Sequence, residues 1–507
     1  MTRRYTGGFI SAKEQATDSN TANGVFTLAE AQEKTALGNF PTGRWTPQRS
    51  LRIRASASAG LSRTFGTPTS AYKWTWSAWV KRGLLSSNLN YPNLFGAGTS
   101  AADQIVLASV SSIDCLNMNL NNASGGYFVT TQVFRDTSAW YHIIVAVDTT
   151  QAIASNRILV YVNGVAVTSF SQVSYPTQNS ATIINSATGH YLGRDGNASR
   201  YFDGYLSEVN FIDGQQLDPT YFGATDPETG TWIPKRYTGT YGNNGFYLDF
   251  RDNSAVTATT IGADRSGNGN NWTPSNISVT AGATYDSMVD VPGIASVSSQ
   301  TEIGGITRGN YCTLNSIGRE YGGNTYSGTF SNANLTYASS GNPSHAFGTI
   351  AVPSDSTVGY YWEVYVDSAD AVRTYIGIID PYAAVSVQSD GSSYSWPYKS
   401  LISSNGGNYY NYAGGTSGGG SGTYTAYTTG DLIQVAYMNG VIWFGKNGTW
   451  MNSGNPAAGT GYIDNAIDTT KTWLPYVGYN SSFTINFGQR PFTYTPPTGF
   501  VALNTYN

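Results

Sequence analysis

Charged side chains are scarce in this chain of 507 residues, where Lys, Arg, Asp and Glu together account for 11%. Soluble domains usually contain about 25% charged residues. The surface must therefore be solvated mainly by hydroxyl and amide groups, which favours an extracellular or virion β-protein over a cytosolic enzyme. A compositional bias of the source lineage is the alternative explanation.

Cysteine and histidine are also rare. Cys115 and Cys312 lie in different halves of the chain and predict no disulfide framework. With only three histidines to add, no zinc-ligand spacing exists. The G-x-S-x-G spacing at 415–419 lies in a Gly-rich run that no predicted helix follows, so we expect no enzyme, and no cofactor apart from the calcium ion considered below. Paired carboxylates such as Glu363 and Asp367 leave a polysaccharide depolymerase as a distant alternative.

Long apolar runs are absent. No run reaches the length that spans a membrane, and the N-terminal residues contain no apolar signal-peptide segment. We therefore expect no membrane insertion and no secretion signal. A protein of this kind that acts outside the cell would leave it by lysis or on a particle.

The few charges are unevenly distributed. Residues 1–82 contain 12 Lys and Arg against 4 Asp and Glu, whereas the rest of the chain contains 15 against 27. Such a basic N-terminal arm indicates docking to a partner, self-association of the arm with the body, or a solvated basic face. It carries no recognised nucleic-acid motif, so nucleic-acid binding is not predicted. The residues expected to anchor the arm are Arg44, Arg49, Arg52 and Arg54.

Residues 1–50 contain the one segment that predicts a helix. Thr27 and Glu30 fit a capping box, residues 28–37 are helix formers, and Gly38 ends the segment. A helix of about ten residues is marginal in water by itself. It must therefore pack against the body of this chain or against another subunit.

Two Asn-Gly dipeptides predict β-hairpins at the centres of two hydrophobic cores. Asn163-Gly164 and Asn439-Gly440 each separate two β-prone apolar runs. Asn-Gly favours the type I′ turn of a two-residue hairpin, because both central residues need a positive φ. Runs that are apolar on both faces need a second sheet stacked on them. The sequence therefore predicts an all-β fold with two β-sandwich, jelly-roll-like domains in tandem.

Further short strands with turn residues between them support this fold. We expect strands at 73–80, 104–109, 127–133, 141–147, 158–162, 165–170, 205–212, 246–250, 359–366, 374–379, 432–438, 441–444, 474–478 and 482–487. Trp76, Trp140, Trp362 and Trp443 are assigned to the cores. The predicted organisation is an anchoring arm (1–50), a first sandwich (51–225), a linker or bridging β segment (226–310) and a second sandwich (311–507).

Five motifs follow one another along the first sandwich: WSAWV at 76–80, WYHIIV at 140–145, ILVYVNGV at 158–165, HYLGRDG at 190–196 and YFDGYLSEVNFIDG at 201–214. Their order and spacing resemble the laminin-G-like, concanavalin-A-like jelly roll. The last motif is similar in particular to the versions found in bacteriophage structural proteins.

The second sandwich carries another set of motifs: YWEV at 361–364, GI at 377–378, GD at 430–431, VIWF at 441–444, KNG at 446–448, the run 483–492, PP at 496–497 and GF at 499–500. This set resembles a SPRY domain. It departs from eukaryotic versions in a Gly- and Tyr-rich insertion at 405–424, so the peptide-binding loops of that family do not carry over directly.

The two resemblances together, behind a leader with GVFTLAEAQEKTALGNF at 24–40, are similar to a phage tail fibre or other virion surface protein. The resemblance implies a structural protein of the virion surface or tail, made in the host cytoplasm, that attaches to a host-surface glycan or protein. It implies other virion proteins as partners of the arm, and a homo-oligomer, a trimer by analogy with fibres. The alternative is a capsid- or tail-decoration protein that binds only other virion proteins.

Sugar binding needs aromatic rings for the apolar faces of the sugar and polar side chains for its hydroxyl groups. Two loop clusters offer both: Tyr191, Arg194, Asp195, Tyr201 and Asp203 in the first sandwich, and Tyr394, Trp396, Tyr398, Tyr409, Tyr410 and Tyr412 in the second. Tyrosine-rich loops on a rigid β-scaffold are also how antibody paratopes bind. The alternative is that these tyrosines cover a sheet edge.

A calcium site is predicted at the same turn of the first sandwich. Asp195, Asn197 and Asp203 flank the turn and supply the oxygen ligands that Ca²⁺ prefers. The alternative is that the two Asp-Gly pairs here are ordinary turn residues, chosen because they tolerate a positive φ.

Overall fold

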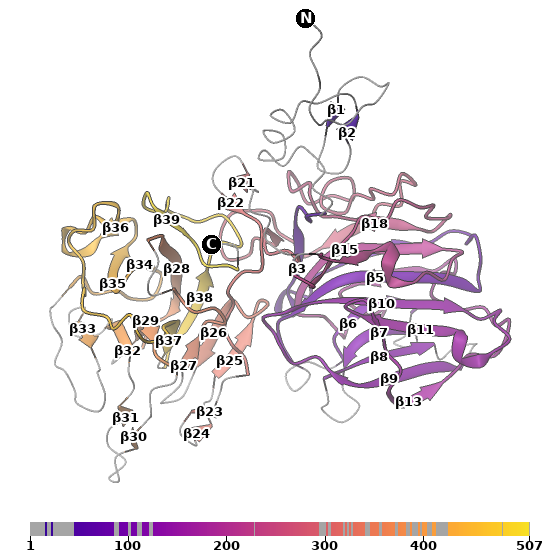
Figure 1. Cartoon of the computed structure of the whole chain (residues 1–507), viewed down its shortest axis with the longest axis horizontal. Helices are drawn as coiled ribbons and strands as arrows, with labels where there is room; N and C mark the ends of the chain where they lie inside the picture. The colour runs from indigo at the N-terminus through magenta and orange to yellow at the C-terminus, as the bar shows by residue number, and fades with distance from the viewer. Residues whose placement is uncertain are drawn as a thin grey trace, which may run out of the picture.

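Two β-sandwiches lie side by side in the computed structural model of the chain (Figure 1). The structure describes residues 45–505 apart from short gaps, the longest of which are 294–300 and 412–423. Of residues 1–44 it describes β1 (Ala16–Thr17) and β2 (Ala22–Asn23), so the helix predicted at 28–37 lies outside the described residues. The described residues form strands and 3₁₀ turns with no helix long and apolar enough to cross a membrane. The all-β prediction is confirmed.

The first sandwich consists of two eight-stranded sheets. One sheet has the order β12 (Val165–Ala166), β11 (Ile158–Val162), β10 (Trp140–Asp148), β5 (Lys73–Arg82), β15 (Gly204–Asp213), β3 (Ser50–Ile53) and β20 (Ser287–Met288), with β18 (Phe246–Leu248) also paired to β15. The other has the order β13 (Phe170–Ser174), β9 (Gly126–Val133), β8 (Cys115–Leu120), β7 (Asp103–Ala108), β6 (Asn93–Ala97), β14 (Gly189–Leu192), β4 (Gly60–Thr64) and β19 (Thr273–Ser275).

Strand alternation explains why the central strands of this sandwich are apolar on both faces. Trp74 and Trp76 of β5 project into the core between the two sheets. On the opposite face of the same sheet, Ile144 and Ile212 pack against a second cluster that includes Phe222. That outer cluster is built by the chain after β15, so the sheet is covered on both sides.

The segment 226–310 both completes the first sandwich and bridges the two. β18, β19 and β20 come from this segment and add strands to the first sandwich. The segment after β20 then runs between the bodies, where Asp290 pairs with Gly309 in an isolated bridge. The segment therefore contributes three strands to the sheets of the first sandwich.

The second sandwich has an eight-stranded and a five-stranded sheet. The first has the order β25 (Gly328–Ser331), β26 (Thr336–Ser339), β38 (Ser482–Asn486), β28 (Gly359–Ser368), β34 (Leu432–Met438), β35 (Val441–Lys446) and β36 (Thr449–Trp450), with β39 (Phe500–Ala502) parallel to β28. The second has the order β27 (His345–Phe347), β37 (Leu474–Gly478), β29 (Tyr375–Ile379), β32 (Tyr398–Ile402) and β33 (Asn408–Asn411).

Short elements connect these sheets. They are the two-stranded pairs β16 (Gly223–Thr225) with β17 (Trp232–Pro234), β21 (Thr301–Glu302) with β22 (Ile306–Thr307), β23 (Glu320–Tyr321) with β24 (Asn324–Thr325) and β30 (Ser386–Val387) with β31 (Tyr394–Ser395). The 3₁₀ turns are η1 (Ala55–Ala57), η2 (Ala154–Asn156), η3 (Pro219–Tyr221), η4 (Met451–Ser453) and η5 (Pro456–Ala458).

Both predicted Asn-Gly hairpins are confirmed. Asn163 and Gly164 have φ values of 49° and 80°, and Asn439 and Gly440 have 45° and 78°. Of the tryptophans assigned to the cores, those at 76, 362 and 443 are buried. Trp140 is only half-buried, because it lies at the boundary with the second sandwich, where its indole N–H donates to Asp290 (3.0 Å).

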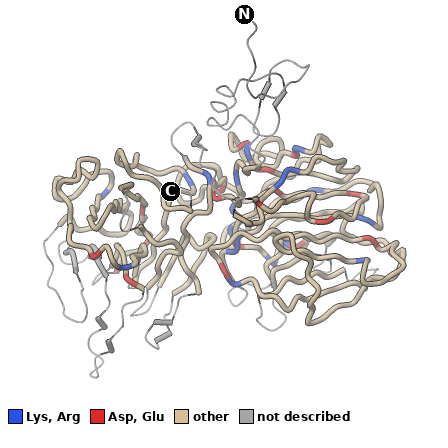
Figure 2. The backbone as a smooth tube through the Cα atoms, viewed as in Figure 1, with Lys and Arg blue, Asp and Glu red and all other residues tan. Residues whose placement is uncertain are grey.

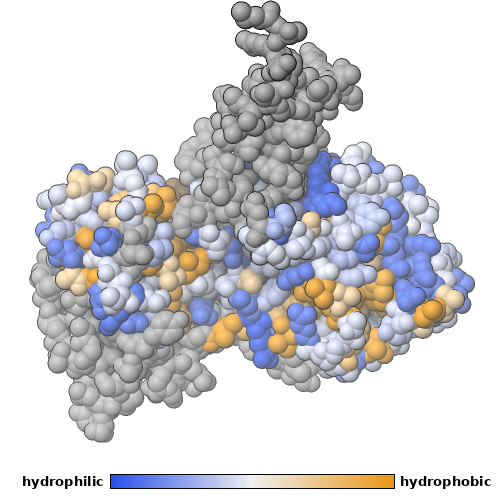
Figure 3. Space-filling model, in the orientation of Figure 1, coloured by the Kyte–Doolittle hydropathy of each residue, from blue (hydrophilic) through white to orange (hydrophobic). Residues whose placement is uncertain are grey.

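The two sandwiches share a buried boundary. Leu84, Tyr205 and Met288 of the first half belong to the hydrophobic core of the second sandwich. The carboxylate of Asp203 accepts the backbone N–H of Ala333 at 2.7 Å, so the first sandwich also binds the second through hydrogen bonds. Basic and acidic segments lie together at this junction (Figure 2). On the face drawn in Figure 3, hydrophobic residues are interspersed with hydrophilic ones over both bodies.

Gly440→Ala is expected to lower the free energy of unfolding by about 1–2 kcal/mol, because alanine is strained at positive φ. The added Cβ would also lie 2.8 Å from the Ile467 carbonyl oxygen. Gly459 has a similar φ of 70° with nothing within 4 Å of a Cβ, so Gly459→Ala measures the strain alone. Urea denaturation of both variants checks this. Equal losses would mean that the contact with Ile467 costs nothing.

Candidate functional site

The outward face of the eight-stranded sheet in the second sandwich carries a cleft. Alternation along β28 turns Trp362 and Val364 into the core and Glu363 and Tyr365 outward. Leu432 of β34 lines the same cleft from the neighbouring strand. The floor of the cleft therefore consists of side chains from adjacent strands. Their positions are fixed by the backbone hydrogen bonds between these strands.

The C-terminal segment covers only one part of this face. Phe500 and the half-buried Phe492 pack on Tyr361, Ala436 and Trp443 and form a small apolar cluster of their own. The neighbouring part of the face remains open, and residues 490–494 form its wall. The cleft thus lies directly beside a segment that is held firmly to the sheet.

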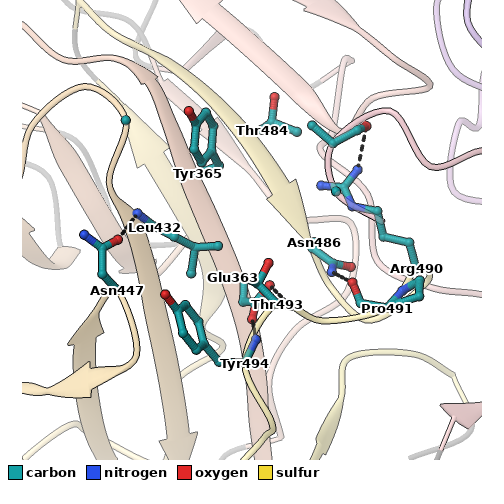
Figure 4. A pocket seen from close by; sticks show the side chains of 13 residues that line it. Glu363, Tyr365, Leu432, Asn447, Thr484, Asn486, Arg490, Pro491, Thr493 and Tyr494 are labelled. Atoms are coloured by element: carbon teal, nitrogen blue, oxygen red, sulfur yellow. Dashed lines mark hydrogen bonds between the residues drawn. The ribbon is translucent and has the colours of Figure 1, made fainter. Parts of the chain in front are cut away.

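The cleft has a volume of about 470 Å³, within the range of small-molecule sites. Its lining residues come from three β-strands, two turns, the segment after β38 and the loop between β19 and β20: Gly282, Ala283, Glu363, Tyr365, Gly430, Leu432, Asn447, Thr484, Asn486, Arg490, Pro491, Thr493 and Tyr494. Figure 4 shows Leu432 between the rings of Tyr365 and Tyr494, with Asn447 at one side. Aromatic and aliphatic surface therefore alternates with amide and hydroxyl groups.

Glu363 holds the wall of the cleft in place. Its carboxylate accepts the backbone N–H groups of Thr493 (2.9 Å) and Tyr494 (2.8 Å) and the hydroxyl of Tyr361 (3.1 Å). Burial raises the pKa of this carboxyl, and the hydrogen bonds oppose the shift without cancelling it. Because its lone pairs are directed at these donors, Glu363 positions Tyr494 rather than transferring a proton.

Another part of the wall comes from the loop between β19 and β20 of the first sandwich. The carbonyl oxygen of Ala283 accepts hydrogen bonds from Arg52 (2.8 Å) and Arg490 (3.2 Å). Arg52 belongs to the first sandwich and Arg490 to the second. The cleft is therefore completed only where the two halves meet.

Two tyrosine hydroxyl groups are available in the cleft. Tyr365 is 40% exposed, and neither its hydroxyl nor that of Tyr494 makes a hydrogen bond to any other described residue. The amide groups of Asn447 and Asn486 are held by backbone and carboxylate partners. A ligand would thus meet pre-oriented polar groups and two tyrosine rings, an arrangement suited to a sugar.

The carboxylates considered for hydrolysis do not form a catalytic pair. Glu363 and Asp367 are four residues apart on one strand, which separates their Cα atoms by about 13 Å. Glycosidase carboxylates lie about 5–10 Å apart. Asp367 also accepts a hydrogen bond from Thr484 (2.8 Å).

Ser77 and His142 form a serine–histidine contact that resembles a nucleophile with its base. Ser77 Oγ lies 2.9 Å from His142 Nε2. His142 Nδ1 accepts the indole N–H of Trp232 at 2.9 Å, so the neutral ring carries its proton on Nε2 and donates to Ser77. Burial lowers the pKa of His142 to about 3, so the ring stays neutral. This tautomer cannot take a proton from Ser77.

The tyrosine cluster predicted on the first sandwich is partly brought together. The Arg194 guanidinium lies over the Tyr191 ring, 4.4 Å from its centroid, so one face of that ring is already covered. Tyr201 is half-buried nearby in sequence and has no contact that links it to the pair. Of the cluster predicted on the second sandwich, Trp396 and Tyr412 lie outside the described residues. The side chains of Tyr394, Tyr398, Tyr409 and Tyr410 also lie outside them.

Two of the three residues predicted to bind calcium, Asp195 and Asp203, are engaged by other groups. The Asp195 carboxylate accepts from Ser199 and Arg200 of its own turn, as the turn alternative expects. Asp203 instead accepts the backbone N–H groups of Ala333 and Ala55, and Asn197 is exposed. No group of three or more His, Cys, Asp or Glu side chains able to hold a metal occurs among the described residues.

The predicted anchoring arginines require a correction. Arg52 is fully buried, and Arg49 and Arg54 are each 8% exposed. Arg52 and Arg54 both contact Asp286, at 3.0 and 2.8 Å. These three arginines are bound inside the chain and do not offer a docking surface, because buried cations need internal partners. Arg44 lies outside the described residues.

The cleft residues Tyr365 and Tyr494 are missing from the sequence-based site. Strand alternation at 360–367 already indicates that Glu363 and Tyr365 share a face, so this part could have been found. Nothing in the local sequence indicates that residues 490–494 and 282–283 close over that face.

A match to a known protein family supports the concanavalin A-like fold predicted for the first sandwich. Residues 56–219 match the concanavalin A-like lectin/glucanases superfamily. This concanavalin A-like domain accounts for well under half of the chain, so the match describes the first sandwich alone. No curated protein matches the sequence.

Solved structures similar to this chain include SPRY and carbohydrate-binding proteins. The SPRY domain of human HERC1 is 18% identical over 30% of this chain and 87% of its own, with a TM-score of 0.21. A putative carbohydrate binding protein from Bacteroides ovatus is 17% identical over 46% of this chain and 59% of its own, with a TM-score of 0.31. Domain 4 of AbnA, an arabinanase from Geobacillus stearothermophilus in complex with arabinotriose, is 18% identical over 29% and 63%, with a TM-score of 0.21. Likeness at this level gives no basis for transferring a ligand.

Proposed function

We propose that this chain is a non-enzymatic binding protein for glycans and that the cleft on the second sandwich is its binding site. The observation that carries the proposal is the pair of tyrosines, Tyr365 and Tyr494, set beside fixed amide and hydroxyl groups. Sugar rings present apolar C–H faces to such rings and hydroxyl groups to such amides. The lectin-type fold of residues 56–219 fits a binding role.

The proposed setting is the surface of a phage particle, as a tail fibre or adhesin. The support for this setting is the resemblance of the paired sandwiches and the leader to phage structural proteins. In this proposal the N-terminal arm contacts other virion proteins, and several copies, a trimer by analogy, present their clefts together. Multivalency turns weak sugar contacts into useful avidity.

The proposal is tested with the purified full-length chain on a glycan array, and with labelled chain imaged on the intact particle. Binding to defined glycans together with a position at the particle surface is the expected result. A particle that loses its integrity without this chain but still adsorbs to its host would favour the decoration alternative. Release of reducing ends from a host polysaccharide would contradict a non-enzymatic role.

Tyr365→Ala and Tyr494→Ala are each expected to weaken binding of the best array glycan by about tenfold, equivalent to about 1.4 kcal/mol. Each variant removes a ring that would stack on the sugar. Tyr462→Ala is the matched control, because Tyr462 is 38% exposed and lies outside the cleft. Titration calorimetry measures the three affinities. Unchanged affinity in both cleft variants would remove the cleft from the proposal.

A further inference from the structure

Carboxylates lie on and just behind the floor of the cleft. Glu363 lines it directly. Asp367 accepts a hydrogen bond from the lining residue Thr484, and Asp431 accepts one from the lining residue Asn447 (2.8 Å each). Three carboxylates therefore lie on the floor of the cleft or one contact behind it.

Three neighbouring cations are already engaged, one of which is Arg52, a donor to the carbonyl oxygen of the lining residue Ala283 (2.8 Å). Lys446 is held by the Asp431 carboxylate (2.9 Å) and the Ala426 carbonyl (2.8 Å). Arg490 is 5% exposed and donates to the carbonyl oxygens of Ala283 and Ile485. Burial, reinforced by the nearby guanidinium of Arg52, lowers the pKa of Arg490 to about 9. Each of these cations therefore already has partners within the chain.

We infer that the cleft selects neutral glycans and rejects those that carry a carboxylate, sulfate or phosphate at the bound position. The inference rests on the proposed function and names the ligand class for the same site. An anionic group entering the cleft would lose its hydration and would face Glu363 and Asp367, while the nearby cations are already bound to partners within the chain. Hydroxyl groups meet no such penalty, because they can both donate and accept hydrogen bonds.

The acidic floor also predicts how the selection responds to pH. Burial raises the pKa of Glu363 and of Asp367, so both carboxyls gain protons at a higher pH than exposed ones do. Lowering the pH therefore removes negative charge from the cleft before exposed carboxylates elsewhere are neutralised. Discrimination against acidic glycans should weaken in that range, while binding of neutral glycans should change little.

The test uses the full-length chain and array glycans in matched pairs that differ by one sialic acid or one sulfate. The expected result is binding of the neutral member at least tenfold tighter than the acidic member. Equal or tighter binding of acidic members that is lost in Tyr365→Ala would overturn the inference and leave the glycan site intact. Absence of binding to every glycan would overturn the proposed function, and the inference with it.

Asp367→Asn removes one charge and keeps an oxygen that can accept from Thr484. It is expected to strengthen binding of the acidic members by about threefold or more, with the neutral members unchanged. Asp468→Asn makes the same change of charge at an exposed position of the second sandwich and should alter neither. An equal gain for both variants would assign the effect to net charge and would overturn the role of the cleft.

Discussion

Asp290→Ala is expected to lower the free energy of unfolding by about 3–5 kcal/mol, the usual cost of leaving a buried charge without its partner. Lys81 and Asp290 are both fully buried, and Lys81 Nζ lies 2.8 Å from Asp290. The same ammonium donates to the Asn310 side chain (2.7 Å) and the Tyr311 carbonyl (2.9 Å). Without Asp290 this cation has no compensating charge, and Trp140 loses its acceptor.

The position of this ion pair decides how the loss should appear. Lys81 belongs to β5 of the first sandwich, whereas Asp290 and Tyr311 belong to the chain that leads into the second. The pair therefore fastens the junction more than either core. We expect the thermal transition of the variant to separate into two steps, because each sandwich keeps its own hydrophobic core.

Calorimetry and urea denaturation measure both effects. Asp252→Ala is the matched control, since Asp252 pairs with Arg265 at 3.8 Å near the surface and should cost less than about 1 kcal/mol. The double variant Lys81→Met, Asp290→Leu removes both charges and should recover much of the loss. A cost of less than 1 kcal/mol for Asp290→Ala would mean that the junction does not depend on this pair.

The same junction explains which part of the sequence analysis failed. The basic excess of residues 1–82 is correct as a count, and one of its interpretations was association of the arm with the body. The described residues support that one for Arg52, Arg54 and Lys81, whose partners Asp286 and Asp290 lie more than 200 residues away in the chain. Pairing at such separations leaves no local signal, so composition could not distinguish it from docking to another protein.

The fold was more accessible than the site because its signals are local. An Asn-Gly turn and the alternation beside it depend on a few neighbouring residues, and both hairpins have the expected φ values. The cleft depends on Tyr494 being tied to Glu363, and on Ala283 being tied to Arg52 and Arg490. These contacts join three distant segments, so the floor could be predicted but its walls could not.

Glu208→Gln is the second substitution with a large expected effect, and the effect should depend on pH. Glu208 is fully enclosed, has a positive φ of 50°, and accepts hydrogen bonds from Trp45 (2.7 Å) and Tyr247 (2.8 Å). Its other oxygen has no hydrogen-bond partner among the described residues. Burial raises the pKa of this carboxyl from 4.5 to about 7.

The direction of this pKa shift determines whether the stability rises or falls with pH. The folded chain binds the proton of Glu208 more tightly than the unfolded chain, so its contribution to stability is complete below about pH 4.5 and is lost as the pH rises through 7. A difference of between two and three pKa units is worth about 3 kcal/mol. Asp203, whose pKa burial raises to about 6, acts in the same direction.

Buried histidines act in the opposite direction, so the wild-type curve alone cannot isolate Glu208. Burial lowers the pKa values of His142 and His190 to about 3, and their contribution is lost as the pH falls below their unfolded value of 6.5. The histidine contributions are the same in the wild type and in Glu208→Gln. They therefore cancel when the free energies of unfolding of the two chains are subtracted at each pH. Glutamine keeps an oxygen for Trp45 and Tyr247 and carries no charge.

Urea denaturation of both chains at several pH values from 4 to 8 gives this difference directly. The glutamine variant should be about as stable as the wild type at pH 4 and about 3 kcal/mol more stable at pH 8. A flat difference for Glu208→Gln would mean that Glu208 is ionised in the folded chain at no cost, and that the Trp45 and Tyr247 hydrogen bonds offset its burial.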